Sequence, residues 1–493
     1  MIAAAAKFPR IVDRTILRSG NDPTNISLLR ATRGGMVAAM RRTLALSALL
    51  CLTAPALAQS PQSVRADDRA NYVRAIAAGY KAAFLCGGIF NAGRTERQVE
   101  ALELKGIYPE YDQIVPTLSA QVDRRAGTVS VAFDRQLTPR LAVWTAGKGC
   151  TLAPIGAPAA AHRSVAPPPV AGPDPRAWPL GDAGIAPRPS DAMARVVDRA
   201  FDGGYGRGSE TLGIVVLRDG RVVAERYRDG FGPFVANRTW SVAKSITGTL
   251  VGLSGVDVRC PADIPEWRIR HRADPRAAIT LDKLLRMASG LHSDTAGNRT
   301  DAIYFGGTTV TEQATSWPLS SRPGERFRYA NNDIMLAARS LRATLGDARY
   351  RALPARLFTA LGMRHTVAQS DWQDNLIASS DMWTTARDLA RLGQFWLQDG
   401  LWQGRRLLPA GWMRYMTTPA GPQPDRSEGY GASIWLFGAA QGLPDGSYSA
   451  QGNRGQYVMV VPSQRLVVVR RGEDPGSARF DVARFTADLI AAP

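Results

Sequence analysis

A serine and a lysine three residues apart are the first pair in this chain whose types and spacing could do chemistry. The sequence Ser-Val-Ala-Lys at 241–244 begins a run of small and apolar residues typical of a buried helix. Residues three apart share one face of a helix, so the amine of Lys244 can reach the hydroxyl of Ser241. A serine hydroxyl becomes a strong nucleophile when a base removes its proton, and a lysine can be that base if burial lowers its pKa. The spacing therefore predicts Ser241 as nucleophile and Lys244 as its proton acceptor.

The same spacing also fits a helix-capping serine beside a solvated lysine. Composition favours the chemical interpretation, because only six of the 61 basic residues are lysine. Arginine fills nearly all ordinary cationic roles in this chain, and a guanidinium group cannot serve as a base. A position that keeps lysine is therefore a position where a deprotonatable amine is useful.

A tyrosine and an asparagine form the second element, as the Tyr-x-Asn at 329–331. A tyrosine near an ammonium group has a lowered pKa, so Tyr329 could relay the serine proton and protonate a leaving group. Asn331 is expected to hydrogen-bond Lys244 and hold it in place. Without that asparagine, a half-buried core aromatic would be the simpler interpretation of Tyr329.

Four blocks follow one another in fixed order: Trp-Ser-Val-Ala-Lys at 240–244, Leu-Leu-Arg-Met-Ala-Ser-Gly-Leu at 284–291, Pro-Gly-Glu-Arg-Phe-Arg-Tyr-Ala-Asn at 323–331 and Gly-Asn-Arg-Gly-Gln at 452–456. Together these blocks resemble the serine β-lactamase and penicillin-binding superfamily. Within it the chain is similar to the class C-like branch of esterases, D-amino peptidases and 6-aminohexanoate-dimer (nylon-oligomer) hydrolases. The resemblance implies an α+β fold with an antiparallel sheet flanked by helices and a helical subdomain, and a Ser/Lys/Tyr acyl-enzyme mechanism.

The resemblance also assigns a third motif to Asn-Arg-Gly at 453–455, on the strand that lines the cleft. It implies that Asn453 and Arg454 contact substrate, that Gly455 supports the turn, and that an oxyanion hole is formed by the backbone NH groups of Ser241 and Gln456. β-Lactamases and penicillin-binding enzymes carry Lys-Thr-Gly at this place, whereas this chain has no lysine after position 283. The difference favours ester or amide cleavage over β-lactam hydrolysis, with Arg454 as the candidate partner of a substrate carboxylate.

Other chemistries find less support in the sequence. A Ser-His-Asp hydrolase would need one of four histidines, and no Gly-x-Ser-x-Gly elbow is present. The histidines and cysteines show no metal-ligand spacing, so neither a metal nor another cofactor is expected. The formal charge of +18 is scattered without a nucleic-acid-binding signature, which leaves a small-molecule or short-peptide ester or amide as the expected partner. The histidines are His162, His271, His292 and His365.

Two alternatives stay open at this stage. The first is a peptidoglycan D,D-peptidase or a β-lactamase, which an exported protein of this fold could be. The second is a ligand-binding or sensor module that keeps the fold and is at most acylated. The number of subunits in the functional protein does not follow from the sequence.

The N-terminal region predicts export. Residues 1–35 precede a good start and are expected to be an extension absent from the mature protein, and residues 36–58 read as a signal peptide with a small-residue cleavage site. We therefore expect a periplasmic or secreted protein, without an integral membrane segment once the signal is removed. In an oxidising compartment Cys86 and Cys150 are the favoured disulfide pair, with Cys260 as a buried free thiol.

The remaining chain divides by composition. Residues 59–153 predict a small α+β module, with a helix over 67–84 and strands at 117–122, 128–133 and 141–145. Residues 154–192 form a Pro/Ala-rich linker or wrapping arm. Residues 193–493 form the hydrolase-like domain, which must position the reactive residues.

This domain begins and ends with strands. Runs at 212–217 and 221–227 meet at Asp219-Gly220, a strong hairpin signal, and runs at 456–461 and 466–471 precede a terminal helix. The middle is mostly helical, as in 385–397. A sheet built from both ends of the domain, with helices between them, predicts an active-site cleft at the boundary of sheet and helices.

Overall fold

The structure is a computed structural model that describes residues 61–158, 166–268, 274–292 and 300–492. The predicted upstream extension and signal peptide lie outside these residues, as do His162 and His271. Within the described chain, buried apolar side chains from Ala75 to Ala492 form one connected core. The N-terminal module therefore shares its core with the hydrolase-like domain.

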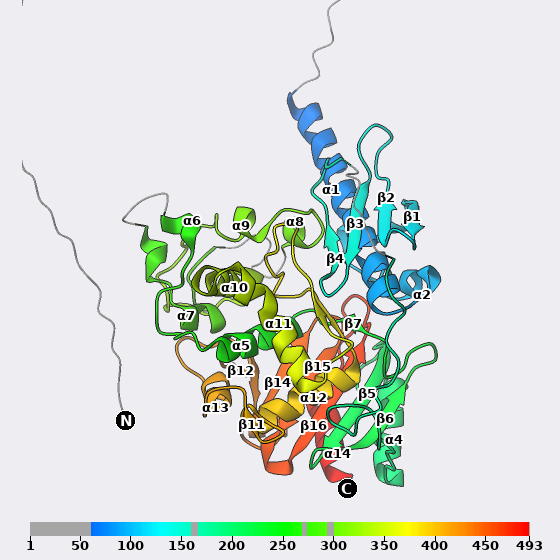
Figure 1. Cartoon of the computed structure of the whole chain (residues 1–493), viewed down its shortest axis with the longest axis vertical. Coiled ribbons are helices and arrows are strands. Elements are labelled where there is room, and N and C mark those ends of the chain that lie inside the picture. Colours follow the sequence, from blue (N-terminus) through cyan, green and yellow to red (C-terminus); the bar gives the residue numbers. More distant parts are fainter. Residues whose placement is uncertain (1–60, 159–165, 269–273, 293–299, 493) are drawn as a thin grey trace, which may run out of the picture. The chain divides into compact units, whose positions relative to one another are not determined.

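The N-terminal module consists of a long helix against a small antiparallel sheet (Figure 1). The disulfide between Cys86 and Cys150 joins the end of the helix to the last strand, with the Cα atoms 6.1 Å apart. That last strand was not predicted from the sequence. The elements are α1 (Pro61–Cys86), η1 (Gly87–Asn91), α2 (Glu96–Ala101), α3 (Pro109–Asp112), η2 (Val115–Thr117), β1 (Ala120–Asp123), β2 (Thr128–Val131), β3 (Arg140–Thr145) and β4 (Gly149–Leu152).

Helix α1 and its continuation are apolar enough to raise the question of a membrane span. Residues Asp68–Asn91 have the length and hydropathy of a span, but 83% of the most apolar stretch is buried inside the protein. Such burial is typical of a core helix, since a span would present its apolar side chains to lipid.

The second half of the Pro/Ala-rich linker, residues 166–192, packs on the hydrolase-like domain. The indole of Trp178 donates to the carbonyl of Gly220 at 2.8 Å. The guanidinium of Arg391 donates to the carbonyls of Pro179 and Gly181, at 2.7 Å each. This part of the linker is therefore a wrapping arm held by hydrogen bonds.

The central sheet has seven strands in the order β12-β13-β14-β15-β16-β5-β6, and every neighbouring pair is antiparallel. Strand β16 from the end of the chain pairs with β5 from the start of the domain, as predicted. Asp219 and Gly220 have φ of 52° and 77°, the left-handed conformations that a type I′ hairpin turn requires. The strands are β5 (Thr211–Arg218), β6 (Arg221–Tyr227), β12 (Gly429–Tyr430), β13 (Trp435–Phe437), β14 (Ser447–Gly452), β15 (Gln456–Val461) and β16 (Leu466–Gly472).

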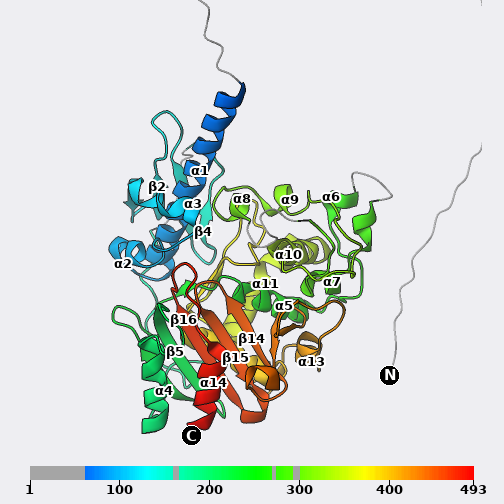
Figure 2. The same cartoon turned by 180° about the vertical axis from the view of Figure 1, so that it is seen from behind.

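Helices cover both faces of this sheet. Helices α5 (Val242–Ser254) and α12 (Ala386–Leu397) pack on one face, and α4 (Asp191–Phe201) and α14 (Val482–Ala491) pack on the other (Figures 1 and 2). Nearly every residue of α5 is buried, which fits its small and apolar composition.

The remaining elements form the helical part of the domain and its connections. The helices are α6 (Pro265–Arg268), η3 (Pro275–Ala278), α7 (Leu281–Leu285), α8 (Asp301–Tyr304), α9 (Val310–Gln313), α10 (Asn331–Leu345), α11 (Asp347–Leu361), α13 (Trp412–Thr417), η5 (Ala439–Gln441) and η6 (Pro462–Gln464). The short strands are β7 (Asn237–Arg238), β8 (Val367–Ala368), β9 (Met382–Thr384), β10 (Leu401–Trp402) and β11 (Arg405–Arg406).

Candidate active site

A cavity of about 1180 Å³ lies where the β14–β15 hairpin meets the start of α5 and the helical part of the domain. Its lining includes Ser241, Tyr329 and Asn331 from the first two motifs and Asn453 from the third. The N-terminal module also reaches it, through Tyr108. The predicted cleft at the boundary of sheet and helices is therefore present, and the module borders it.

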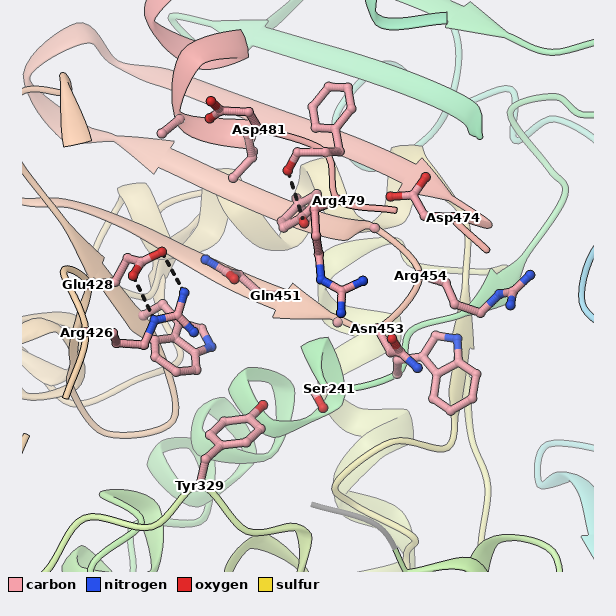
Figure 3. Close-up of a pocket in the computed structure, with 18 of the residues that line it drawn as sticks. Ser241, Tyr329, Arg426, Glu428, Gln451, Asn453, Arg454, Asp474, Arg479 and Asp481 are labelled. Atoms are coloured by element: carbon pink, nitrogen blue, oxygen red, sulfur yellow. Dashed lines mark hydrogen bonds and ion pairs between the residues drawn. The ribbon is translucent and has the colours of Figure 1, made fainter. Parts of the chain in front are cut away.

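Ser241 stands at the N-terminus of α5, directly after a strained residue. Trp240 has φ of 49°, a conformation that costs a bulky side chain about 1–3 kcal/mol. The residue is 3% exposed, and its ring packs against Phe84 of the module and under the guanidinium of Arg238. This packing holds the strained backbone and presents Ser241 to the cavity (Figure 3).

The amine of Lys244 is buried and has three hydrogen-bond partners. The nitrogen lies 2.8 Å from Ser241 Oγ, 2.6 Å from Asn331 Oδ1 and 2.9 Å from the backbone carbonyl oxygen of Ser379. In its neutral form the amine donates to the last two oxygens, which can only accept, and its lone pair accepts from the Ser241 hydroxyl. None of these three is charged, and burial lowers the pKa of Lys244 well below 10.5. The site therefore favours a neutral amine in contact with the serine hydroxyl, which is the form that can accept a proton.

The hydroxyl of Tyr329 is hydrogen-bonded to Ser241, but its pKa is shifted opposite to the predicted direction. Burial raises the pKa of Tyr329 to about 12, and the hydrogen bonds with Ser241 and Trp435 lower it by less. The prediction required an ammonium group nearby, whereas this site favours neutral Lys244, whose nitrogen lies 5.0 Å from the ring centre. Tyr329 is thus a phenol at neutral pH and is suited to donate a proton.

The residues that complete the lysine site were not predicted from the sequence. The Ser379 carbonyl accepts from Lys244, and the Ser379 hydroxyl shares a 2.5 Å hydrogen bond with Tyr304. Tyr304 also lines the cavity. No motif marks Ser379, because its contribution to Lys244 is a backbone atom that every residue type possesses.

The third motif meets Ser241 at the end of β14. A Cβ atom placed on Gly452 would lie 3.1 Å from the backbone nitrogen of Ser241, so the two backbones are in close contact. Asn453, the next residue, lines the cavity beside Ser241 (Figure 3). Gln456 is fully buried, and its side chain donates to the carbonyls of Arg454 and Gly472. The geometry therefore brings Asn453, and not Gln456, beside the nucleophile.

Gly455 and Arg454 serve the turn instead of facing a substrate. Any side chain at Gly455 would collide with Arg470 and Asp474. Arg454 is 7% exposed, and its guanidinium points away from Ser241 (Figure 3). Its Nε donates to Glu473 at 2.5 Å, and the remaining nitrogens bond carbonyls of the N-terminal module. The predicted contact of Arg454 with a substrate carboxylate is therefore wrong, because this cation is already buried and paired.

Two other arginines border the cavity, and neither was singled out from the sequence. Arg426 forms a bidentate pair with Glu428, at 2.7 and 2.8 Å. Arg479 extends from the segment between β16 and α14 toward Asn453 and donates to the carbonyl of Ala478 at 2.8 Å (Figure 3). Cationic spacing in sequence gives no hint of these positions, since arginine is spread over the whole chain.

The prediction for the unpaired cysteine is wrong in one respect. Cys260 is a free thiol, but it is exposed and not buried as predicted. Within the described residues, no cluster of three or more His, Cys, Asp or Glu side chains could hold a metal ion.

Comparison with known proteins places the hydrolase-like domain in a family. A family model described as β-lactamase matches residues 193–492. The chain is 27% identical over 259 residues to a 6-aminohexanoate-dimer hydrolase of Paenarthrobacter ureafaciens, a match that covers 49% of this chain and 63% of that protein. The chain thus spans less than two thirds of the relative's length.

Two solved structures are similar to parts of this chain. A Bacillus anthracis protein provisionally named a 6-aminohexanoate-dimer hydrolase has a TM-score of 0.51 and 21% identity, over 60% of this chain and 80% of its own. A class C β-lactamase has a TM-score of 0.48 and 12% identity, over 61% of this chain and 95% of its own. The predicted β-lactamase/transpeptidase-like fold is confirmed, and because the family model covers more than half of the sequence, the chain belongs to the β-lactamase family.

Proposed function

We propose that this protein is an exported serine hydrolase that cleaves an amide or ester bond through an acyl-enzyme on Ser241. The observation that carries the proposal is the buried amine of Lys244, 2.8 Å from Ser241 Oγ and without a charged hydrogen-bond partner. The Paenarthrobacter relative is named a 6-aminohexanoate-dimer hydrolase, and this name supports hydrolysis as the reaction class.

In the acylation step, neutral Lys244 accepts the proton of Ser241 as the serine oxygen attacks the substrate carbonyl. The negative charge that develops on the carbonyl oxygen is stabilised by the backbone NH groups of Ser241 and Asn453, which we propose in place of Gln456. Tyr329, protonated at neutral pH, donates its proton to the leaving amine or alcohol. Its phenolate then recovers a proton from the Lys244 ammonium, so the pair returns to its starting state.

In the deacylation step the same pair works on water. Lys244 accepts a proton from water as the water attacks the acyl carbonyl, and Ser241 leaves with a proton from the pair. The free serine and the neutral amine are thereby restored. No cofactor is required for either step.

The cavity supports a substrate of modest size. Its volume of about 1180 Å³ exceeds the usual range for small-molecule pockets of roughly 300–1,000 Å³, so a short peptide or an oligomeric amide also fits. Export is supported by the Cys86–Cys150 disulfide, because such bonds persist in oxidising compartments.

The test is intact-mass analysis after a fluorophosphonate probe, with p-nitrophenyl ester turnover measured in parallel. We expect one adduct and measurable turnover in the wild type, and loss of both in Ser241→Ala. Ser427→Ala, which changes an exposed serine, is the control and should match the wild type. Labelling and turnover that persist in Ser241→Ala would overturn the proposal.

Activity against defined substrates then separates the branches of the family. Nitrocefin, a D-Ala-D-Ala peptide and the linear 6-aminohexanoate dimer should be assayed with the same Ser241→Ala control. We expect turnover of the linear amide or of esters to exceed turnover of nitrocefin, since the chain lacks the Lys-Thr-Gly of β-lactamases. An adduct on Ser241 that never clears would favour the sensor alternative.

A further inference from the structure

We propose that Arg454 is a positioning residue that fastens the oxyanion side of the active site to the N-terminal module. This inference rests on the proposed function, because it assigns a role in placing the backbone NH of Asn453. It makes the module, which the family match at 193–492 does not include, a required part of the catalytic apparatus.

The guanidinium of Arg454 binds three backbone carbonyls of one module segment, residues 102–106. It donates to the carbonyl oxygens of Leu102 at 2.8 Å, Lys105 at 3.0 Å and Gly106 at 3.0 Å. These carbonyls belong to the turn that follows α2, and those of Leu102 and Gly106 each accept one further hydrogen bond, from the backbone NH of Lys105 and of Gly476. A planar fork of donors suits such a cluster, whereas a single ammonium does not.

Gly106 also binds the segment between β16 and α14, which borders the cavity. Its carbonyl also accepts from the backbone NH of Gly476 at 3.0 Å, in the segment that carries Arg479. Gly106 has φ of 61°, and a Cβ atom there would lie 2.6 Å from Pro475. The turn at 453–455 and the segment after β16 are therefore both fixed to one backbone oxygen of the module.

The turn needs such an anchor because its backbone is unfavourable. Arg454 has φ of 57° and Gly455 has φ of 79°, and a non-glycine residue in this region is strained. The strained residue is the one whose side chain is tied down. Since Asn453 directly precedes it, release of the Arg454 side chain would let the turn relax and move the NH of Asn453 away from Ser241.

The charges around the anchor indicate a permanent contact and not a passing one. Arg454 and Glu473 are 7% and 1% exposed, and on the module side Arg94 and Glu103 form a second buried ion pair. Charges are buried in this way only when their partners stay in place, since an unpaired buried charge is strongly unfavourable. The module therefore stays docked while the enzyme works.

The experiment uses the full chain and removes the anchor without leaving a buried charge. The variant Arg454→Met with Glu473→Gln is assayed for kcat and KM on a p-nitrophenyl ester and for the rate of fluorophosphonate labelling. Loss of one oxyanion donor reduces kcat about 10²-fold to 10³-fold, so displacement of the donor should reduce it about 10-fold to 100-fold. KM should stay within about threefold, and the labelling rate should fall with kcat.

Arg454→Lys keeps a charge opposite Glu473 but cannot meet all three carbonyls, so kcat should lie between the wild type and the double variant. Lys148→Met is the matched control. It removes another ion pair between module and domain, Lys148 with Asp374 at 2.6 Å, where both side chains are partly exposed, and it should not change kcat.

Three outcomes would overturn the inference. The first is a folded double variant with kcat within twofold of the wild type. The second is an increase in KM alone, which would return Arg454 to substrate binding. The third applies if the double variant does not fold, and it is a kcat of Arg454→Lys equal to that of the wild type. Labelling that survives Ser241→Ala would instead sink the proposed function, so the two failures are distinguishable.

Discussion

Lys244 and Arg454 are two buried basic residues of the hydrolase-like domain, and their surroundings differ in charge. Lys244 sits among neutral oxygens, namely Ser241 Oγ, Asn331 Oδ1 and the Ser379 carbonyl, and burial lowers its pKa. Burial is the largest single influence on the pKa of Arg454 and lowers it, but Glu473, Tyr80 and Asp474 together raise it by more, so its pKa is raised.

This difference in surroundings separates a catalytic basic residue from a structural one within the same protein. A buried cation beside a carboxylate stays charged and holds structure, whereas a buried amine without one is ready to exchange a proton. Arg470, which binds Asp474 at 2.7 and 2.9 Å, belongs with Arg454. Substitutions at both kinds of site test this division.

Replacing the exchangeable amine by a permanent cation should have the largest effect. In Lys244→Arg the positive charge remains, but guanidinium cannot accept the serine proton. We expect kcat/KM for a p-nitrophenyl ester to fall about 10³-fold to 10⁴-fold. Lys148→Arg, on the exposed side of the module, serves as control and should keep wild-type activity. A loss below tenfold would show that Lys244 acts through its charge alone.

Removing a scaffolding cation should mainly cost stability. Arg470→Met leaves the carboxylate of Asp474 buried without its main partner, so the free energy of unfolding should fall by about 3–5 kcal/mol. Urea denaturation of the variant measures this change. Arg470→Met combined with Asp474→Leu should recover most of the loss. A single variant within about 1 kcal/mol of the wild type would mean that this pair is not structural.

The contrast between the two sites also marks what the sequence could predict. The helix at 242–254 and the proximity of Ser241 and Lys244 follow from local periodicity and spacing, which short segments carry in full. These features depend on residues whose relation is fixed by one helix or by a motif. The family and fold were accessible for the same reason.

The failures share a different cause. The direction of Arg454 depends on a left-handed residue in a tight turn and on carbonyls about 350 positions earlier. The pKa of Tyr329 depends on burial by Tyr430 and Trp435, and the Ser379 contact uses a backbone atom. All three features depend on long-range packing or on a backbone group. Long-range packing and backbone groups leave no signature in residue type or spacing.

Adding a carboxylate beside Lys244 should keep its amine charged, as the carboxylate of Glu473 does for Arg454. Asn331 Oδ1 lies 2.6 Å from the Lys244 nitrogen, so Asn331→Asp places a negative charge there. The pKa of Lys244 should rise by about 1–2 units. Because the neutral amine is the active form, the acid limb of the kcat/KM profile should move to higher pH, with about tenfold less activity at pH 7.

The control for this change is Asn331→Ser, which shortens the side chain but adds no charge. It should lower activity without moving the acid limb of the profile. An unmoved limb in Asn331→Asp would show that another group, and not Lys244, sets the acid side of the pH dependence.

The smallest effect expected is also the most direct contrast with Arg470, because it has the opposite sign. Lys244→Met removes an amine that leaves no carboxylate behind, so inactivation should accompany a gain in unfolding free energy of about 1 kcal/mol at pH 7. The gain has a defined pH dependence. The folded-state pKa of Lys244 lies below the unfolded value near 10.5, so wild-type folding releases a proton between these values and wild-type stability rises with pH. The advantage of the variant should therefore be largest at low pH and disappear as pH approaches 10.5, when measured by urea denaturation. A loss of several kcal/mol, as expected for Arg470→Met, would instead place Lys244 among the structural cations and remove the basis for separating the two sites.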